Sequence, residues 1–248
     1  MPTPYFQFKQ FTIRHDHSAM KVGTDGVLLG AWAQTPTTTS ASSIMEEEVK
    51  EGVHILDVGT GTGVIALMLA QRFPNAQIEG IDIDEESVIQ AQENVSTSPF
   101  ATQVSIEKKD FRNIVFFSKK YHLIVSNPPF YQEETLGGNE VRDAARHTMS
   151  LPFEKLIENA AQLLLPDGYF SIIIPYQSAP IFISLCAQKQ LYLTRRTDIR
   201  STERKPFKRT LLEFSTHIHS TTVDTLTLYN PQNQRTHDYA NLTKDFYL

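Results

Sequence analysis

A glycine-rich turn follows a short apolar segment and has the residue types needed to hold a nucleotide-like ligand. Residues 53–56 (VHIL) suit a buried parallel strand, and residues 57–63 (DVGTGTG) come directly after them. Residues 64–72 then have the apolar character of a helix packed on a sheet. Glycine is needed in such a turn because a Cβ would hold a ligand away from the backbone, and the following helix start offers N–H groups. The pattern predicts the first strand–turn–helix unit of a nucleotide-binding α/β sheet.

An acidic residue stands at the end of the next strand-like segment. Residues 77–82 end in Asp82, where a carboxylate can accept hydrogen bonds from both hydroxyls of a ribose and would repel the 2′-phosphate of NADP. The glycine spacing is G-x-G-x-G, whereas the dinucleotide pattern is G-x-G-x-x-G. With Asp57 before the glycines and Asp82 after the next strand, this form resembles the cofactor turn of S-adenosylmethionine (SAM) methyltransferases. SAM is therefore favoured over NAD, and a tight turn that binds nothing is the structural alternative.

A second motif, Asn127-Pro128-Pro129-Phe130, follows the strand-like residues 121–126. Ligands of open α/β sheets bind at the carboxyl ends of the strands. The prolines restrict the backbone, so the Asn127 side chain and the Pro128 carbonyl can act as two oriented acceptors, with Phe130 as a flat face. Such a site suits an exocyclic amine on a planar group. Methyl transfer to that amine would depend on positioning and on hydrogen bonds that strengthen as the nitrogen becomes positive. A stacked base would have to be flipped out to reach it, and a plain surface turn is the alternative.

Two further pairs of residues have both a functional and a structural interpretation. Thr24 and Asp25 could cap a helix that runs to Trp32, or they could face the amino-acid end of the cofactor. Asp110 and Phe111 follow the strand-like residues 103–107, where the acid could accept from an adenine amino group and the ring could cover its face. A loop acid beside a core phenylalanine explains the second pair equally well.

The segment from Arg195 to Arg209 concentrates positive charge in a chain whose net charge is −5. Phosphate contacts from this segment would give salt-dependent affinity for nucleic acid with little reading of sequence, whereas a solvated loop is the alternative. The paired lysines at 108–109 and 119–120 could extend the surface. His15 and His17 bracket an acid without further ligands nearby, so no metal site is expected. The basic residues are Arg195, Arg196, Arg200, Arg204, Lys205, Lys208 and Arg209.

Alternation of strand-like and helix-like segments predicts a doubly wound parallel sheet. The last two strands have no helix between them, which indicates an antiparallel edge. Residues 5–14 alternate around aromatic side chains and predict an extended arm or small hairpin, and residues 133–150 predict a surface loop or lid. Residues 166–168 (PDG) are expected to end a helix that begins at Phe153. The expected strands are 53–56, 77–82, 103–107, 121–126, 169–174, 191–194 and 210–214, and the expected helices are 64–72, 85–97, 153–165 and 178–189.

Composition sets outer limits on these interpretations. A chain of 248 residues can bury a full core as one α/β domain, and its hydrophobic and charged fractions are ordinary. No apolar run approaches the ~20 residues of a membrane span, and the N-terminal residues lack the pattern of a signal peptide. The single cysteine, Cys186, lies in an apolar helical pattern and is predicted to be a core residue. One cysteine cannot build a disulfide framework or a zinc cluster. A cytoplasmic location without membrane, DNA or obligate protein partner is expected.

The motif at residues 127–130 is similar to the [N/D]-P-P-[F/Y/W] motif of amino methyltransferases that act on adenine, guanine or a glutamine amide. More narrowly, the whole chain resembles the bacterial tRNA1(Val) adenine-N6 methyltransferase family, which modifies adenosine 37 on the 3′ side of the anticodon. Residues 21–32 are the most specific part of this resemblance. It is carried by residues 8–11, 19–26, 28–33, 67–71, 91–94, 126–131, 145–146 and 246–248.

The resemblance implies a Rossmann-like class I SAM methyltransferase with a seven-stranded, mostly parallel sheet, an antiparallel edge and a short N-terminal extension. Residues 1–248 would form one domain, in which residues 1–34 cover the cofactor, residues 35–51 are a variable loop or helix, and residues 52–248 are the core. The substrate would be tRNA, held by the basic segment and Arg146, and the product S-adenosylhomocysteine. By motif position, Thr24, Asp25, Asp57, Gly59, Gly61, Asp82, Asp110 and Phe111 would bind SAM, and Asn127, Pro128 and Phe130 would hold the target base.

Three other functions share parts of this pattern. A protein glutamine-N5 methyltransferase would bring an N-terminal helical domain, for which residues 1–52 leave no room. A ribosomal RNA guanine-N2 methyltransferase often carries a duplicated domain, and no repeat is present. An RNA-binding module on an inactive methyltransferase fold is disfavoured because Asp57, Asp82 and Asn127 are intact. N6-methylation of an adenine in tRNA is the preferred interpretation.

Overall fold

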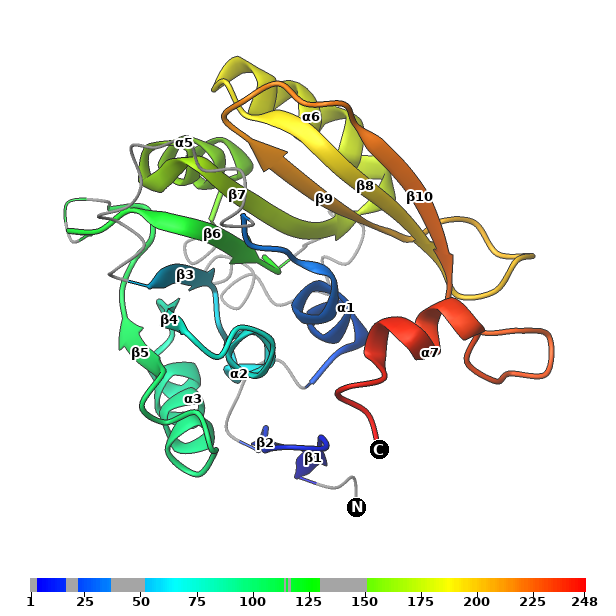
Figure 1. The fold of residues 1–248 in the computed structure, drawn as a ribbon, viewed down its shortest axis with the longest axis horizontal. Helices are drawn as coiled ribbons and strands as arrows, with labels where there is room; N and C mark the ends of the chain where they lie inside the picture. Colours follow the sequence, from blue (N-terminus) through cyan, green and yellow to red (C-terminus); the bar gives the residue numbers. More distant parts are fainter. Residues whose placement is uncertain (1–3, 17–21, 37–51, 114, 116, 130–150) are drawn as a thin grey trace, which may run out of the picture.

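The computed structural model describes residues 4–16, 22–36, 52–113, 115, 117–129 and 151–248. Strands and helices alternate along most of this chain, as the sequence predicts (Figure 1). The strands are β1 (Tyr5–Gln7), β2 (Thr12–Arg14), β3 (Val53–Val58), β4 (Ala76–Asp82), β5 (Val104–Lys108), β6 (Tyr121–Ser126), β7 (Leu164–Pro175), β8 (Tyr192–Arg200), β9 (Arg209–Ser215) and β10 (Thr222–Thr227). The α-helices are α1 (Thr24–Trp32), α2 (Val64–Arg72), α3 (Glu85–Ser96), α5 (Phe153–Leu163), α6 (Ala179–Gln188) and α7 (His237–Thr243).

One sheet of eight strands, in the order β10-β8-β9-β7-β6-β3-β4-β5, forms the centre of the molecule (Figure 1). Neighbouring strands are parallel except that β9 is antiparallel to both β7 and β8. The predicted Rossmann-like sheet is confirmed, with two corrections. Strand β10 adds an eighth member at the edge, and the antiparallel strand lies inside the sheet. The reason is burial, since nearly every residue of β9 is buried whereas β8 and β10 have many partly or fully exposed positions.

The boundary between α5 and β7 also differs from the prediction. The helix ends at Leu163, ahead of the Pro166–Gly168 segment, which lies within β7. The residue before a proline avoids helical backbone, so the chain turns extended early. Pairing of β7 with β6 shifts register between Tyr121 and Leu123, opposite this segment. The segment therefore ends the helix and also makes an irregular start to the strand.

Two hydrophobic cores cover the two faces of the sheet. Side chains along a strand alternate between faces, so Ile55 of β3 joins the core under α1, α2 and α3, whereas Leu56 joins the core under α5 and α6. Cys186 of α6 is fully buried in the second core, as predicted. Within the described ranges, no helix is long and apolar enough to cross a membrane.

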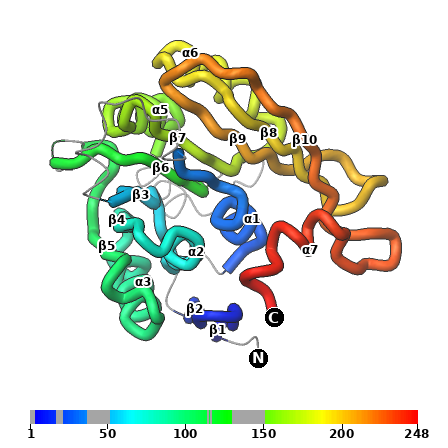
Figure 2. Tube along the Cα trace, in the orientation of Figure 1, coloured from blue at the N-terminus to red at the C-terminus, as the bar shows by residue number. Residues whose placement is uncertain are grey.

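The N-terminal residues form the small hairpin β1–β2, and it packs beside the last residues of the chain (Figure 2). The amide of Lys9 donates to the carbonyl of Phe246 at 2.8 Å, and the ring of Phe8 stacks on that of Tyr247. Asn94 of α3 connects this hairpin to the glycine turn. Its side chain accepts from the Arg14 amide (2.8 Å) and donates to the carbonyls of Arg14 and Thr62 (both 2.9 Å).

Candidate active site

The two predicted motifs meet at the carboxyl edge of the sheet. Val58, at the end of β3, pairs with Ser126, at the end of β6. The Ser126 hydroxyl donates to the Val58 carbonyl at 2.9 Å, which ties the two strand ends together. The glycine turn after Val58 and Asn127 after Ser126 are therefore neighbours, as the strand pattern predicts.

Two glycines of the turn leave open space over the backbone. Gly59, Gly61 and Gly63 have φ values of +72°, +54° and +79°, a region that favours glycine. A Cβ built on Gly59 or Gly61 would meet no atom within 4 Å, whereas a Cβ on Gly63 would lie 3.4 Å from Ala91 of α3. Gly59 and Gly61 thus shape a cradle that a ligand can enter, and Gly63 lets a helix approach.

The backbone N–H groups of this turn are largely used within the protein. Gly59 and Thr60 both donate to the carbonyl of Ile81 at 2.9 Å, and Gly61 donates to Asp82 Oδ2 at 2.9 Å. Gly63 donates to the Thr60 carbonyl. These four N–H groups of the turn are therefore not free for a ligand. Because a pyrophosphate would bind through free N–H groups, this part of the turn fits a ligand without phosphates, such as SAM.

Asp57 is a fully buried acid below this cradle. Its Oδ2 accepts from the Thr60 hydroxyl at 2.7 Å, whereas Oδ1 has no hydrogen-bond partner among the described residues. Burial raises the pKa of Asp57 to about 7, against the opposing effects of Thr60 and the Ala66 amide, with nearby Asp82 adding to the rise. A buried acceptor without a partner needs an explanation. A donor from the ligand, such as the ammonium of a methionine moiety, fits it.

Asp82 is held in one orientation at the rim of the cradle. Oδ1 accepts from the Asp84 amide at 3.0 Å and Oδ2 from the Gly61 amide. Burial raises its pKa. Each carboxylate oxygen keeps a second lone pair, so Asp82 can still accept from the two ribose hydroxyls that the sequence analysis assigned to it.

Asp110 and Phe111 are adjacent in the sequence but have different surroundings in the structure. The guanidinium of Arg112 binds the Asp110 carboxylate at 2.8–2.9 Å and lowers its pKa. The ring of Phe111 is buried in the second core, edge-on to Phe117, which favours the core role for this ring. Asn159 of α5, a buried residue that the sequence analysis did not select, donates to the Phe111 carbonyl at 2.5 Å. The sequence feature that could have identified Asn159 is its position as a polar residue on an otherwise apolar helix face.

Thr24 and Asp25 lie in the first turn of α1 and do not cap it. The N-cap is Gly23, without a side-chain hydrogen bond, so the capping alternative is wrong. Asp25 instead forms an ion pair with Arg209 at the start of β9, with 2.7 Å between Oδ2 and Nε. A Cβ on Gly26 would lie 3.3 Å from Val64. The start of α1 therefore touches the start of α2, beside the glycine turn.

Comparison with known proteins decides the family. A model of the methyltransferase small domain matches residues 37–179. The tRNA1(Val) (adenine(37)-N6)-methyltransferase of Phocaeicola vulgatus is 42% identical over 250 residues, covering 100% of this chain and 99% of the relative. The enzyme of the same name from Flavobacterium psychrophilum is 42% identical over 98% of this chain and 99% of its own length. The chain belongs to the tRNA1(Val) (adenine(37)-N6)-methyltransferase family.

The fold itself is shared more widely. The crystal structure of a predicted O-methyltransferase from Agrobacterium tumefaciens superposes with a TM-score of 0.68 at 17% identity. The match covers 90% of this chain and 96% of that one. At 17% identity this likeness shows the fold alone. The shared fold extends over nearly the whole chain.

The basic segment of this family member divides into a buried part and an exposed part. Arg195 stacks over the ring of Trp32, with 3.5 Å from the guanidinium carbon to the ring centre, and donates to Trp32 O and Glu213 Oε2. Its side chain is 18% exposed. Arg195 therefore anchors α1 to the sheet, and we remove it from the predicted RNA surface. Arg196 is paired with Asp198 at 2.8 Å.

The remaining basic residues lie at the carboxyl edge of the sheet, where the two motifs meet. Arg200 ends β8, and Arg204, Lys205 and Lys208 follow in the connection to β9, where all three are exposed. The amide of Tyr176, just beyond β7, donates to the Lys208 carbonyl at 3.1 Å. Since β7 is the neighbour of β6, this connection stands close to Asn127. Phe130 and Arg146 lie outside the described residues.

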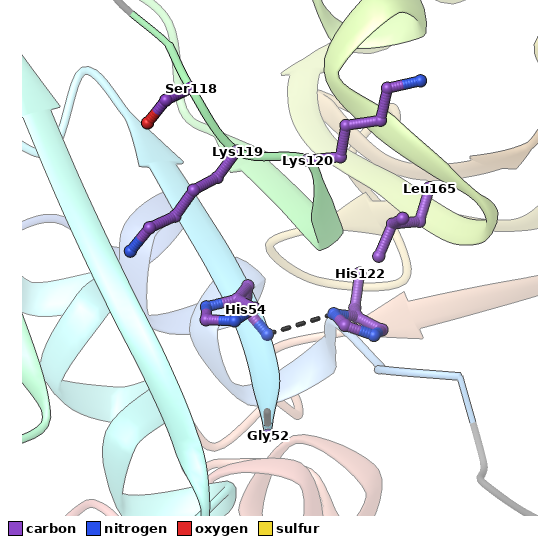
Figure 3. Close-up of a pocket in the computed structure, with 7 residues that line it drawn as sticks. All are labelled: Gly52, His54, Ser118, Lys119, Lys120, His122 and Leu165. Carbon is purple, nitrogen blue, oxygen red and sulfur yellow. Dashed lines mark hydrogen bonds between the residues drawn. The ribbon is translucent and has the colours of Figure 1, made fainter. Parts of the chain in front are cut away.

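A separate cavity of about 580 Å³ lies at the opposite edge, near the amino ends of β3 and β6 (Figure 3). The amide of His54 donates to His122 Nδ1 at 3.1 Å, and the side chains of Lys119 and Lys120 extend in different directions. These two lysines therefore do not extend the basic surface at the carboxyl edge. In the described part of the chain, no cluster of histidine, cysteine or acidic residues could hold a metal ion.

Proposed function

We propose that this protein transfers a methyl group from SAM to N6 of an adenine in tRNA, with adenosine 37 of tRNA1(Val) as the substrate and the cytoplasm as the place of action. The observation that carries the proposal is the contact between β3 and β6. It sets the cradle at Gly59 and Gly61 beside Asn127. The names of the relatives, which are about 40% identical over the full chain, support the choice of adenine and tRNA.

The residues of the cradle would hold SAM, the methyl donor, by their shape and by accepting its hydrogen bonds. SAM supplies an electrophilic methyl group on a sulfonium centre. Gly59 and Gly61 leave room for it, and Asp82 would accept from its ribose. The unpartnered oxygen of Asp57 would accept from its ammonium, with Thr24 and Asp25 at the same end. Asp110 would accept from its adenine, at the end of β5. The segment formed by residues 1–34 would cover the cofactor.

Asn127 and Pro128 would hold the amine that accepts the methyl group. Asn127 is half-buried, and no described residue hydrogen-bonds to its side chain, while Pro128 is buried. Two acceptors, the Asn127 amide oxygen and the Pro128 carbonyl, can take both amine hydrogens and so point the nitrogen lone pair at the donor. Both hydrogen bonds strengthen as the nitrogen becomes positive. The nitrogen–methyl bond would form as the sulfur–methyl bond of SAM breaks, which leaves S-adenosylhomocysteine. The extra proton on nitrogen would pass to solvent afterwards, so no strong base is needed. Phe130 would stack on the base.

Methylation of tRNA from cells that lack this gene tests the proposal. Wild-type protein should transfer label from SAM into one tRNA species, and nucleoside analysis should identify N6-methyladenosine. Asn127→Ala should lower kcat at least about 100-fold, since it removes an acceptor that matters most in the transition state. Lys120→Ala, at the opposite edge, should retain full activity.

The other outcomes each point to another function. Label in guanosine would indicate a guanine-N2 methyltransferase. Label in no RNA, with SAM still bound, would indicate a protein substrate or an RNA-binding module. Full activity of Asn127→Ala, with an unchanged melting temperature, would refute the role given to Asn127.

A further inference from the structure

Two aromatic rings pack against each other at the carboxyl edge of the sheet, and a guanidinium group lies near each of them. Tyr176 follows β7, and Phe207 lies in the connection between β8 and β9; their ring centroids are 5.4 Å apart, with 34° between the planes. The guanidinium carbon of Arg196 lies 5.4 Å from the centre of the Tyr176 ring, and that of Arg200 lies 5.4 Å from the centre of the Phe207 ring. Both rings are half-buried, so each keeps surface that faces solvent. We name Tyr176 and Phe207 the aromatic pair.

The guanidinium groups beside the aromatic pair are fixed by bonds to the sheet. Arg196 Nε donates to Asp198 Oδ1 at 2.8 Å, and Arg200 Nε donates to the Thr227 hydroxyl of β10 at 2.9 Å. Their planes are thereby held by β8 and β10 before any ligand arrives. Aromatic rings that keep solvent-facing surface, with guanidinium groups beside them, are the kind of surface on which bases of single-stranded nucleic acid stack.

The aromatic pair lies close to the amine-binding motif. Ser126, which precedes Asn127, pairs with Ile172 of β7, and β7 continues only to Pro175 before Tyr176. From strand spacing and rise, the Cα atoms of Ser126 and Pro175 are roughly 11 Å apart. The exposed Arg204, Lys205 and Lys208 flank Phe207 and can reach phosphates. A base next to the one held at Asn127 is within reach of the pair.

Base flipping would create a need for the aromatic pair. A target adenine must leave its stack to enter the site at Asn127, which also deprives the flanking base of a stacking partner. We propose that Tyr176 and Phe207 form a stacking platform for a nucleobase that flanks the target adenine in the RNA. This inference rests on the function proposed above and extends it from the reacting base to its neighbour. Lysines of the same connection contact phosphates, while the aromatic pair contacts a base.

The test uses a stem–loop RNA that carries the target adenine, with the fluorescent base 2-aminopurine at each flanking position in turn. Wild-type protein with bound SAM should quench one of these positions, because stacking on an aromatic ring quenches 2-aminopurine. Phe207→Leu and Tyr176→Leu keep an apolar side chain without an aromatic face. Each should weaken RNA affinity about 5- to 100-fold and abolish the quenching, whereas Phe207→Tyr should retain both. Affinity for SAM and kcat at saturating RNA should stay near the wild-type values.

Two controls separate stacking from other roles. Tyr192→Leu removes a partly exposed aromatic residue at the start of β8, on the opposite edge of the sheet, and should change nothing. Lys205→Ala should reduce the salt dependence of RNA affinity by about one unit of slope, whereas Phe207→Leu should weaken affinity equally at all salt concentrations.

The platform is overturned if the leucine variants bind the RNA with wild-type affinity or retain the quenching. It is also overturned if they lose SAM affinity and melting temperature together, because the pair would then only hold the connection to β7. A wild-type protein that neither binds nor methylates the stem–loop would contradict the proposed function itself.

Discussion

Replacing the buried acid Asp57 with asparagine should make the stability of the free protein less dependent on pH. Asp57 is fully buried, and its Oδ1 has no partner among the described residues. Its pKa rises from 3.8 to about 7 on folding. An asparagine at this position would have the same size and could still accept from the Thr60 hydroxyl, but it does not titrate.

The sign and size of this change in stability with pH follow from the linkage between protonation and folding. Below pH 3.8 the Asp57 carboxyl is protonated in both states and costs nothing. Between pH 3.8 and about 7 the unfolded chain ionises while the folded protein keeps its proton, so wild-type stability falls by about 1.4 kcal/mol per pH unit. Above about pH 7 both states are ionised and the penalty stays constant. From pH 5 to pH 8, the wild type should therefore lose about 3 kcal/mol relative to Asp57→Asn.

Urea denaturation of both proteins at several pH values between 5 and 8, without SAM, measures this difference. Only its change with pH matters, because the cost of burying the new amide is the same at every pH. Glu86→Gln is the control, since Glu86 is an exposed carboxylate in the first turn of α3. Its difference from the wild type should not vary over this range.

Parallel stability profiles for wild type and Asp57→Asn would refute the reasoning. They would mean that the carboxylate is ionised with little cost in the folded protein, because the Thr60 hydroxyl and the Ala66 amide stabilise its charge more than burial opposes it. Asp57→Asn should also weaken SAM binding, because the amide nitrogen would point a donor at the ammonium. A more stable protein that binds its donor poorly is the expected combination.

Three further predictions concern residues that hold the site in place. Arg195→Met should destabilise the protein by about 3–5 kcal/mol in urea, since it leaves the 3%-exposed Glu213 without its cation; lost RNA affinity with unchanged stability would contradict this. Gly30→Ala would place a Cβ 3.0 Å from Met68 Cβ and force α1 from α2, at a cost of about 1–3 kcal/mol by the same measurement; wild-type stability would show that the helices can adjust. Asn94→Ala should cost about 2 kcal/mol and raise the Kd for SAM, measured by calorimetry, because it removes the hydrogen bonds that tie the hairpin to the glycine turn; an unchanged Kd would show that the turn keeps its shape alone.

The placement of the two motifs could be predicted from the sequence because it depends on local patterns. Each motif directly follows an apolar strand, and the carboxyl ends of parallel strands share one edge of the sheet. The pairing of Val58 with Ser126 confirms this inference. Asp82 follows the same rule, one strand further along.

The features that could not be predicted depend on partners far along the chain. The carbonyl of Ile81, from another strand, takes up two N–H groups of the glycine turn. Arginine is usually found at the surface, yet Trp32 and Glu213 form a buried site for the guanidinium of Arg195. Strand β10 has no apolar alternation, because four of its six residues are exposed at the sheet edge. The role of Arg209 as the partner of Asp25 is likewise invisible without the fold.

The insertion of β9 between β7 and β8 divides the sheet into two parts with different freedom to evolve. Strands β3 to β6 are joined by long crossovers, and a change there disturbs the donor cradle. Strands β8 and β9 form a hairpin whose connection, residues 201–208, lies beyond the paired strands, apart from Lys208, whose amide donates to the Ile199 carbonyl. Because lengthening a surface loop costs little free energy, that connection can be exchanged while the cradle stays intact. One methyl-transfer core could thereby acquire new RNA targets by alteration of a single hairpin.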